Sequence, residues 1–183
     1  MGLYATASGG TDNYAIHSEG IFRLTDINIQ RIGTNSVSIG GGAPSVADSF
    51  FVGASAGYNA TSASYSNFLG YFAGQSASDA LYSNLFGYQV GKFFTGNNIG
   101  ANNIIIGTNI SLPNAQANSI NLGGVLFGTG TYATTTGDPS ITAQTSGRIG
   151  IAVVSPVATL DVNGDTIISG SDRYLNFSTT SGS

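Results

Sequence analysis

The chain has 183 residues, of which only 8% are charged, and its nine acidic and five basic residues give a net charge of −4. So few cations cannot neutralise a run of phosphates, and nucleic-acid binding is therefore not expected. The absence of Cys excludes a disulfide framework and thiolate metal sites. The apolar runs are too short for a membrane-spanning helix, so we expect no membrane insertion.

The composition predicts an all-β fold. Glycine is abundant, with 27 residues, and hydrophobic residues make up 41% of the chain, which argues against disorder. Many of the remaining residues are β-branched, aromatic or small and polar, a mixture typical of short strands joined by tight turns. Helix is disfavoured because glycine and β-branched residues are poor helix formers.

Three segments are predicted in chain order. Residues 1–34 form an N-terminal strand-rich segment, in which residues 14–17 and 21–24 alternate in the manner of half-buried strands. Residues 35–128 form a repeat shaft of the β-roll or β-helix type. Residues 129–183 form a C-terminal neck or shaft segment containing a β-hairpin.

An internal repeat of about 17 residues defines the centre of the shaft, in residues 49–65, 66–82 and 83–99. Looser copies occur at 35–43, 102–111 and 118–128, each with an Asn leading a short apolar run that stops at Gly. The equivalent positions of the central copies are Gly53, Gly70 and Gly87; Gly57, Gly74 and Gly91; Ser49, Ser66 and Ser83; and Phe51, Phe68 and Leu85.

Each repeat unit is too short for a helix pair and matches one coil of strand and turn. A single unit cannot bury its apolar face, so the units must stack, with Phe51 over Phe68 over Leu85. Asn67 and Asn84 are expected to form a polar ladder in which one amide satisfies the next. Because the apolar content exceeds what one thin solenoid can hide, we expect several chains to share a core.

The C-terminal segment predicts a hairpin. Residues 159–162 have strand character, Asn163 and Gly164 are a strong two-residue turn signal, and residues 166–168 would form the returning strand.

Two motifs resemble a known class of fibrous proteins. The repeats SNFLGYFAG (66–74) and NNIIIGTNIS (102–111) resemble those of bacteriophage tail fibres and, less closely, the β-roll heads of trimeric autotransporter adhesins. GRIGIAVVSPVATLDVNGDTIISG (147–170) resembles the segment that often precedes an endosialidase-type chaperone domain in tail fibres.

The resemblance implies an elongated parallel homotrimer that serves as a structural fibre on the extracellular tail of a virion. It would contact other tail proteins and contribute to binding a cell-surface glycan or protein receptor. The alternatives are an adhesin head on a bacterial surface and a polysaccharide-degrading tailspike. Trimers could also join end to end into filaments.

No catalytic, cofactor or metal site is predicted. His17 has only Glu19 near it in the sequence, and Asp161, Asn163 and Asp165 lack the later Glu of a calcium loop. The stretch from Gly87 to Lys92 resembles a phosphate loop only faintly, because the repeat already explains its glycines. Nine scattered acids, including Asp48 and Asp79 in turns, do not suggest a glycosidase pair.

The aromatic side chains Tyr58, Tyr71 and Tyr88 leave two possibilities open. They could stack on sugar rings at the surface, or they could pack in the core or between chains. Packing is favoured, because aromatic burial is a large stabilising contribution in a chain so poor in charge.

Overall fold

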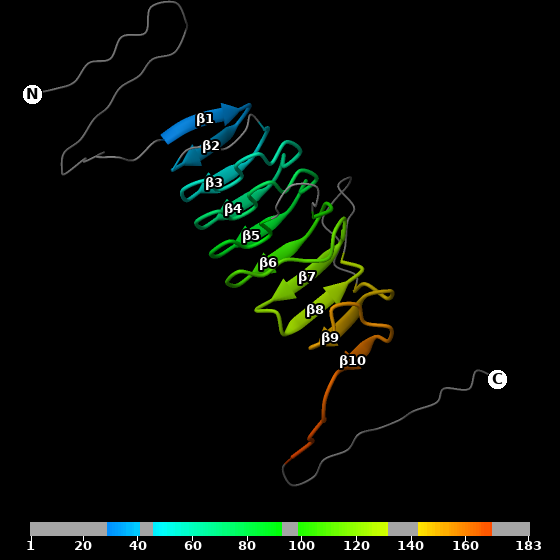
Figure 1. Ribbon diagram of the computed structural model, residues 1–183. Helices are drawn as coiled ribbons and strands as arrows, with labels where there is room; N and C mark the ends of the chain where they lie inside the picture. Colours follow the sequence, from blue (N-terminus) through cyan, green and yellow to red (C-terminus); the bar gives the residue numbers. More distant parts are fainter. Residues whose placement is uncertain (1–28, 41–45, 93–98, 132–142, 170–183) are drawn as a thin grey trace, which may run out of the picture.

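A computed structural model describes residues 29–40, 46–92, 99–131 and 143–169 (Figure 1). Within these ranges the chain is all-β, with ten strands in a single sheet and no helix. The predicted strands at 14–17 and 21–24 and the lone His17 lie outside the described residues.

The strands follow one another in the sheet in the same order as in the sequence. They are β1 (Ile29–Gly33), β2 (Ser36–Ile39), β3 (Phe50–Val52), β4 (Asn67–Leu69), β5 (Asn84–Phe86), β6 (Ile104–Ile106), β7 (Ser119–Leu122), β8 (Leu126–Thr129), β9 (Arg148–Ile151) and β10 (Leu160–Val162). Figure 1 shows them as successive rungs, with the chain looping away from the sheet between one rung and the next.

Strands β2 to β7 pair in parallel and form a β-solenoid of about five turns. Successive coils advance by 13, 17, 17, 20 and 16 residues, as measured between the register partners Val37, Phe50, Asn67, Asn84, Ile104 and Ile120. The strands stay in register despite these unequal steps, because the extra or missing residues are taken up in the loops.

Beneath the sheet the core contains a column of side chains that point inward from the middle of strands β3 to β6. Phe51, Phe68, Leu85 and Ile105 are fully buried and stand in register one above another. The rings of Phe51 and Phe68 stack with their centroids 4.6 Å apart and their planes 10° apart. The expected stack of Phe51, Phe68 and Leu85 is therefore present.

Small residues line the turn side of the coils. Ala56, Ala73 and Ala77 are fully buried there. Gly74 adopts a positive φ of +63°, and a Cβ on it would overlap the Phe68 ring. Alanine and glycine are thus the residues that let a turn close directly over an aromatic core.

A glycine also ends each central strand. Gly70 has a φ of +135°, and a Cβ built on it would collide with the backbone carbonyl of Gly87 in the next coil. Only glycine combines this conformation with so close an approach of two backbones.

A buried hydroxyl ladder holds the coils together at the other end of the strands. Ser49 Oγ accepts a hydrogen bond from the Ser66 N–H (3.2 Å), and Ser66 Oγ accepts one from the Ser83 N–H (3.0 Å). Each of these hydroxyls also donates to a backbone carbonyl, as Ser66 does to Ala80 (2.6 Å). The ladder continues through Asn103 to Ser119, and it explains why serine recurs at this position.

Both ends of the parallel stack are closed by antiparallel strands. β1 pairs antiparallel with β2, and β8 pairs antiparallel with both β7 and β9. The turn between β7 and β8 contains Gly123 and Gly124, both with positive φ, as a type I′ turn requires.

The predicted C-terminal hairpin is wrong. β10 forms at residues 160–162 as expected, but it pairs in parallel with β9, and the N–H of Asn163 donates to Ile151 O (3.0 Å). Residues 165–169 form no strand, and Ile167 is 82% exposed. Parallel pairing with the preceding strand β9 has therefore prevailed over the local turn signal.

Candidate functional site: the outer face of the sheet

The outer face of the sheet carries two parallel rows of side chains, one on each side of the buried column. The first outer row, from β2 to β10, consists of Val37, Phe50, Asn67, Asn84, Ile104, Ile120, Gly128, Ile149 and Leu160. The second outer row, from β1 to β10, consists of Ile29, Ile39, Val52, Leu69, Phe86, Ile106, Leu122, Leu126, Ile151 and Val162.

The second outer row is apolar at all ten strands. Its members are half-buried or exposed, reaching 44% exposure at Ile106 and 52% at Ile29. An unbroken line of aliphatic and aromatic side chains on an open sheet face indicates a surface that another molecule covers.

Sequence reasoning missed this row, although a signal was present. In the six parallel strands each of its members immediately precedes the glycine that ends the apolar run, as Leu69 precedes Gly70. The repeat draws attention instead to the inward residues such as Phe68, which the coil needs for its own core.

The first outer row is apolar except in two neighbouring coils. There Asn67 and Asn84 take the place that Phe50 occupies on one side and Ile104 on the other. The Asn67 Nδ2 donates a hydrogen bond to Asn84 Oδ1 (2.9 Å), so the expected amide ladder exists. It lies at the start of β4 and β5, on the outer face of the sheet rather than in a turn.

A third line of side chains, the corner row, precedes the strands. It consists of Asn35, Asp48, Tyr65, Tyr82, Asn102 and Asn118, all in the left-handed conformation with φ between +51° and +60°. Asn and Asp adopt this conformation readily, whereas tyrosine does so rarely. Tyr65 and Tyr82 stack with their centroids 5.0 Å apart, in the same two coils that carry Asn67 and Asn84.

The remaining tyrosines lie at the surface. Tyr58, Tyr71 and Tyr88 are 43%, 45% and 48% exposed, so packing in the chain's own core is a wrong prediction for all three. The inner positions of these turns are filled by small or aliphatic residues such as Ala73 and Val90, which leave no space for a ring.

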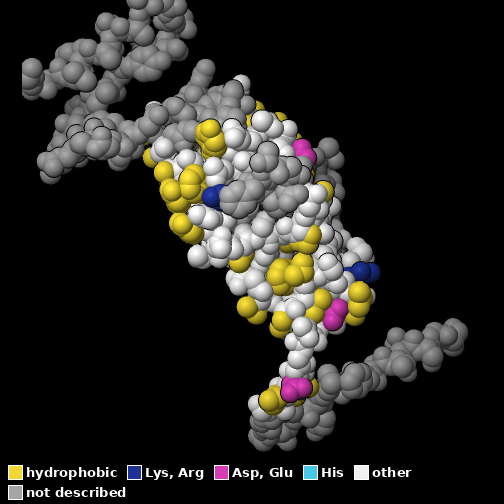
Figure 2. Space-filling model, viewed as in Figure 1, with side chains coloured by type: hydrophobic (Ala, Val, Ile, Leu, Met, Phe, Trp, Pro, Cys, Tyr) yellow, Lys and Arg dark blue, Asp and Glu magenta, His cyan; other side chains and the backbone are white. Residues whose placement is uncertain are grey.

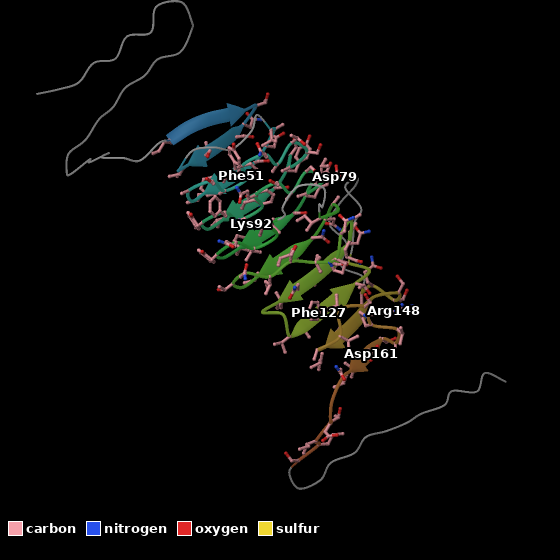
Figure 3. All side chains as sticks on the ribbon, in the orientation of Figure 1. Phe51, Asp79, Lys92, Phe127, Arg148 and Asp161 are labelled. Carbon is pink, nitrogen blue, oxygen red and sulfur yellow. The ribbon has the colours of Figure 1, made fainter. Side chains whose placement is uncertain are left out.

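Two of these tyrosines belong to an aromatic corner that follows the strands. The rings of Tyr71 and Tyr88 stack at 5.5 Å, and Phe72 packs against Tyr71. The Lys92 ammonium lies 4.2 Å from the centre of the Phe72 ring, and Gln89 Nε2 donates to the Tyr88 hydroxyl (2.9 Å). Figure 2 shows hydrophobic side chains gathered beside a basic one at this edge, where Figure 3 labels Lys92.

The candidate chemical motifs have structural roles where they are described. Asp161 Oδ2 accepts from the Val157 N–H (3.0 Å), which is turn chemistry. The N–H groups of Gly87 and Gly91 donate to Leu69 O and Ile110 O, and are thereby engaged in the solenoid rather than aimed at a phosphate.

Acidic and metal-binding residues are not brought together in the described ranges. No group of three or more His, Cys, Asp or Glu residues suitable for a metal ion occurs there. Asp79, in the loop between β4 and β5, and Asp161, on β10, lie well apart (Figure 3).

No family model, curated protein or solved structure matches this chain. Among the residues with a described structure, none forms a helix of the length and apolarity needed to cross a bilayer.

Proposed function

We propose that three copies of this chain assemble in parallel and in register into a rigid fibre shaft, with the outer faces of their sheets turned toward one another. The shaft is a structural, non-catalytic part of a virion tail, and it positions or contributes to a surface that binds a host receptor. The unbroken second outer row is the observation that carries this proposal.

The length of the row favours a partner of the same shape. Ten strands have nine spacings of about 4.8 Å, so the row extends over roughly 43 Å in a straight line. A partner that covers it must present an apolar line of equal length and equal pitch. A second copy of this chain meets both conditions, because its own row repeats at the same spacing.

The scarcity of charge also favours self-association. From β2 to β10 neither outer row carries a charged residue; at β1, Arg31 is the register partner of Val37. In an in-register assembly each residue meets its own copy, and a charge would then face a like charge. Apolar and amide side chains can contact their own copies without charge repulsion.

The aromatic corner is the surface that we assign to contact with a receptor. Tyr71, Tyr88 and Lys92 offer ring edges, hydroxyls and a cation, a combination suited to protein surfaces or polar glycans. The two tyrosine rings stack on each other, so a ligand would meet mainly their edges.

Light scattering on the full chain tests the assembly. The expected mass is three times 18.5 kDa. Leu69→Lys in the second outer row should reduce it to that of one chain, whereas Thr61→Lys, on an exposed turn, should leave the trimer intact. A folded wild-type monomer at micromolar concentration would refute the proposal.

Incubation with host capsule or lipopolysaccharide tests the non-catalytic role. We expect no new reducing ends. Release of sugar would instead identify the chain as a polysaccharide-degrading tailspike.

A further inference from the structure

We infer that Asn67 and Asn84 set the axial register of the chains, that is, the height at which each copy stands against its neighbours. The inference rests on the proposed trimer. It starts from the polar interruption of the first outer row, where two amides stand between Phe50 and Ile104.

The coil itself does not require asparagine at these positions. Phe50 and Ile104 hold the same place in the adjoining strands, with the same strand pairing on either side. The hydrogen bond between Asn67 and Asn84 lies at an exposed place, where such a bond adds little to the stability of one chain. The stability of a single chain therefore does not explain why asparagine occupies these two positions.

Evenly spaced strands leave the axial register of neighbouring chains undetermined. The second outer row is apolar throughout, so a copy displaced by one coil, about 4.8 Å, would still meet apolar side chains along almost its whole length. Hydrophobic contact is not directional and cannot by itself distinguish the aligned assembly from the displaced one.

The amide pair removes this ambiguity. In the aligned assembly every Asn67 and Asn84 stands level with amides of the neighbouring chains. A displacement of one coil places Asn84 against Ile104 of one neighbour and Phe50 against Asn67, so two amides at each interface face apolar groups. Polar groups buried without partners are strongly disfavoured, as with single buried Asn residues that fix the register of coiled coils.

The chemistry of the amide suits this role. Asn67 and Asn84 use one donor and one acceptor between them, which leaves further N–H groups and a carbonyl oxygen for other chains. An amide both donates and accepts, so it is satisfied by a copy of itself. A carboxylate or an ammonium group in the same place would repel its copies.

Disulfide cross-linking between chains tests the inference, since the protein has no Cys of its own. Chains carrying Phe86→Cys are mixed with differently sized chains carrying Ile106→Cys, then unfolded together, refolded and oxidised. Aligned assemblies bring identical positions level with each other, whereas a displacement of one coil brings the two different positions level. We expect same-position disulfides to exceed mixed ones at least tenfold.

The decisive variant is Asn67→Val with Asn84→Val in both chains. The trimer should persist, while the ratio of same-position to mixed disulfides should fall at least fivefold. Asn84→Val alone serves if the double variant does not fold. Asn102→Gly with Asn118→Gly is the matched control, because it removes another hydrogen-bonded amide pair from adjacent coils and should leave the ratio unchanged.

The outcomes separate the two proposals. An unchanged ratio in a trimeric Asn67→Val, Asn84→Val variant overturns the register role alone. A monomeric wild-type chain, or a trimer without disulfides between the outer faces, overturns the proposed assembly and the register role together.

Discussion

Replacing Gly74 by alanine measures how tightly a turn closes over the core. The new Cβ would overlap the Phe68 ring, and the backbone is held at φ +63°. The left-handed conformation costs alanine about 1–2 kcal/mol, and overpacking adds about 1–3 kcal/mol. We therefore expect Gly74→Ala to lower the free energy of unfolding by about 2–5 kcal/mol, measured by urea denaturation at a fixed chain concentration.

Gly123→Ala isolates the backbone contribution. Gly123 has nearly the same φ, +65°, but no atom lies within 4 Å of the place that the new methyl group would take, so its loss should stay near about 1–2 kcal/mol. Combining Gly74→Ala with Phe68→Leu should recover stability relative to the sum of the single losses, with a coupling of about 0.5–3 kcal/mol. Equal losses at Gly74 and Gly123, or strictly additive effects with Phe68→Leu, would show that the overlap with the ring does not exist.

Two further predictions concern buried hydroxyls and strained tyrosines. Ser38→Ala should stabilise the protein by about 1–3 kcal/mol because Ser38 Oγ is buried with no hydrogen-bond partner among the described residues, whereas Ser66→Ala should destabilise it by a similar amount. Thermal denaturation showing the same sign for both would contradict this. Tyr65→Asn with Tyr82→Asn should raise Tm by about 2–4 °C, because relief of left-handed strain exceeds the lost ring stacking. A lower Tm would mean that stacking dominates.

The repeat allowed the parallel part of the fold to be predicted from the sequence. The positions of Phe51, Phe68 and Gly70 recur at equal spacing, and equal spacing in a stacked solenoid places residues directly above one another. The inward-pointing residues and the strand ends could be inferred in this way because each depends on its own coil and the next.

Features that lie outside the repeat, or that depend on the space inside the coil, could not be inferred. β10 prefers β9 to a local hairpin because Leu160 and Val162 continue the two outer rows beside Ile149 and Ile151. The surface position of Tyr71 was missed because its ring is large and apolar, while the room inside the coil is set by the backbone. No local sequence pattern indicates how much space the backbone leaves inside the coil.

The antiparallel strands at either end of the solenoid have a consequence for size. A stack of identical parallel coils presents, at each end, the hydrogen-bonding edge that another stack could extend, which is how open fibrils grow. β1 pairs antiparallel with β2, and β8 with β7, so both end coils of the parallel stack are already paired within the chain, and a following molecule would meet β1 or β10 instead of a parallel coil. The length of the solenoid is then set by the number of coils in one polypeptide. Inserting or deleting a coil would change that length by about 4.8 Å and leave the antiparallel strands at both ends unchanged.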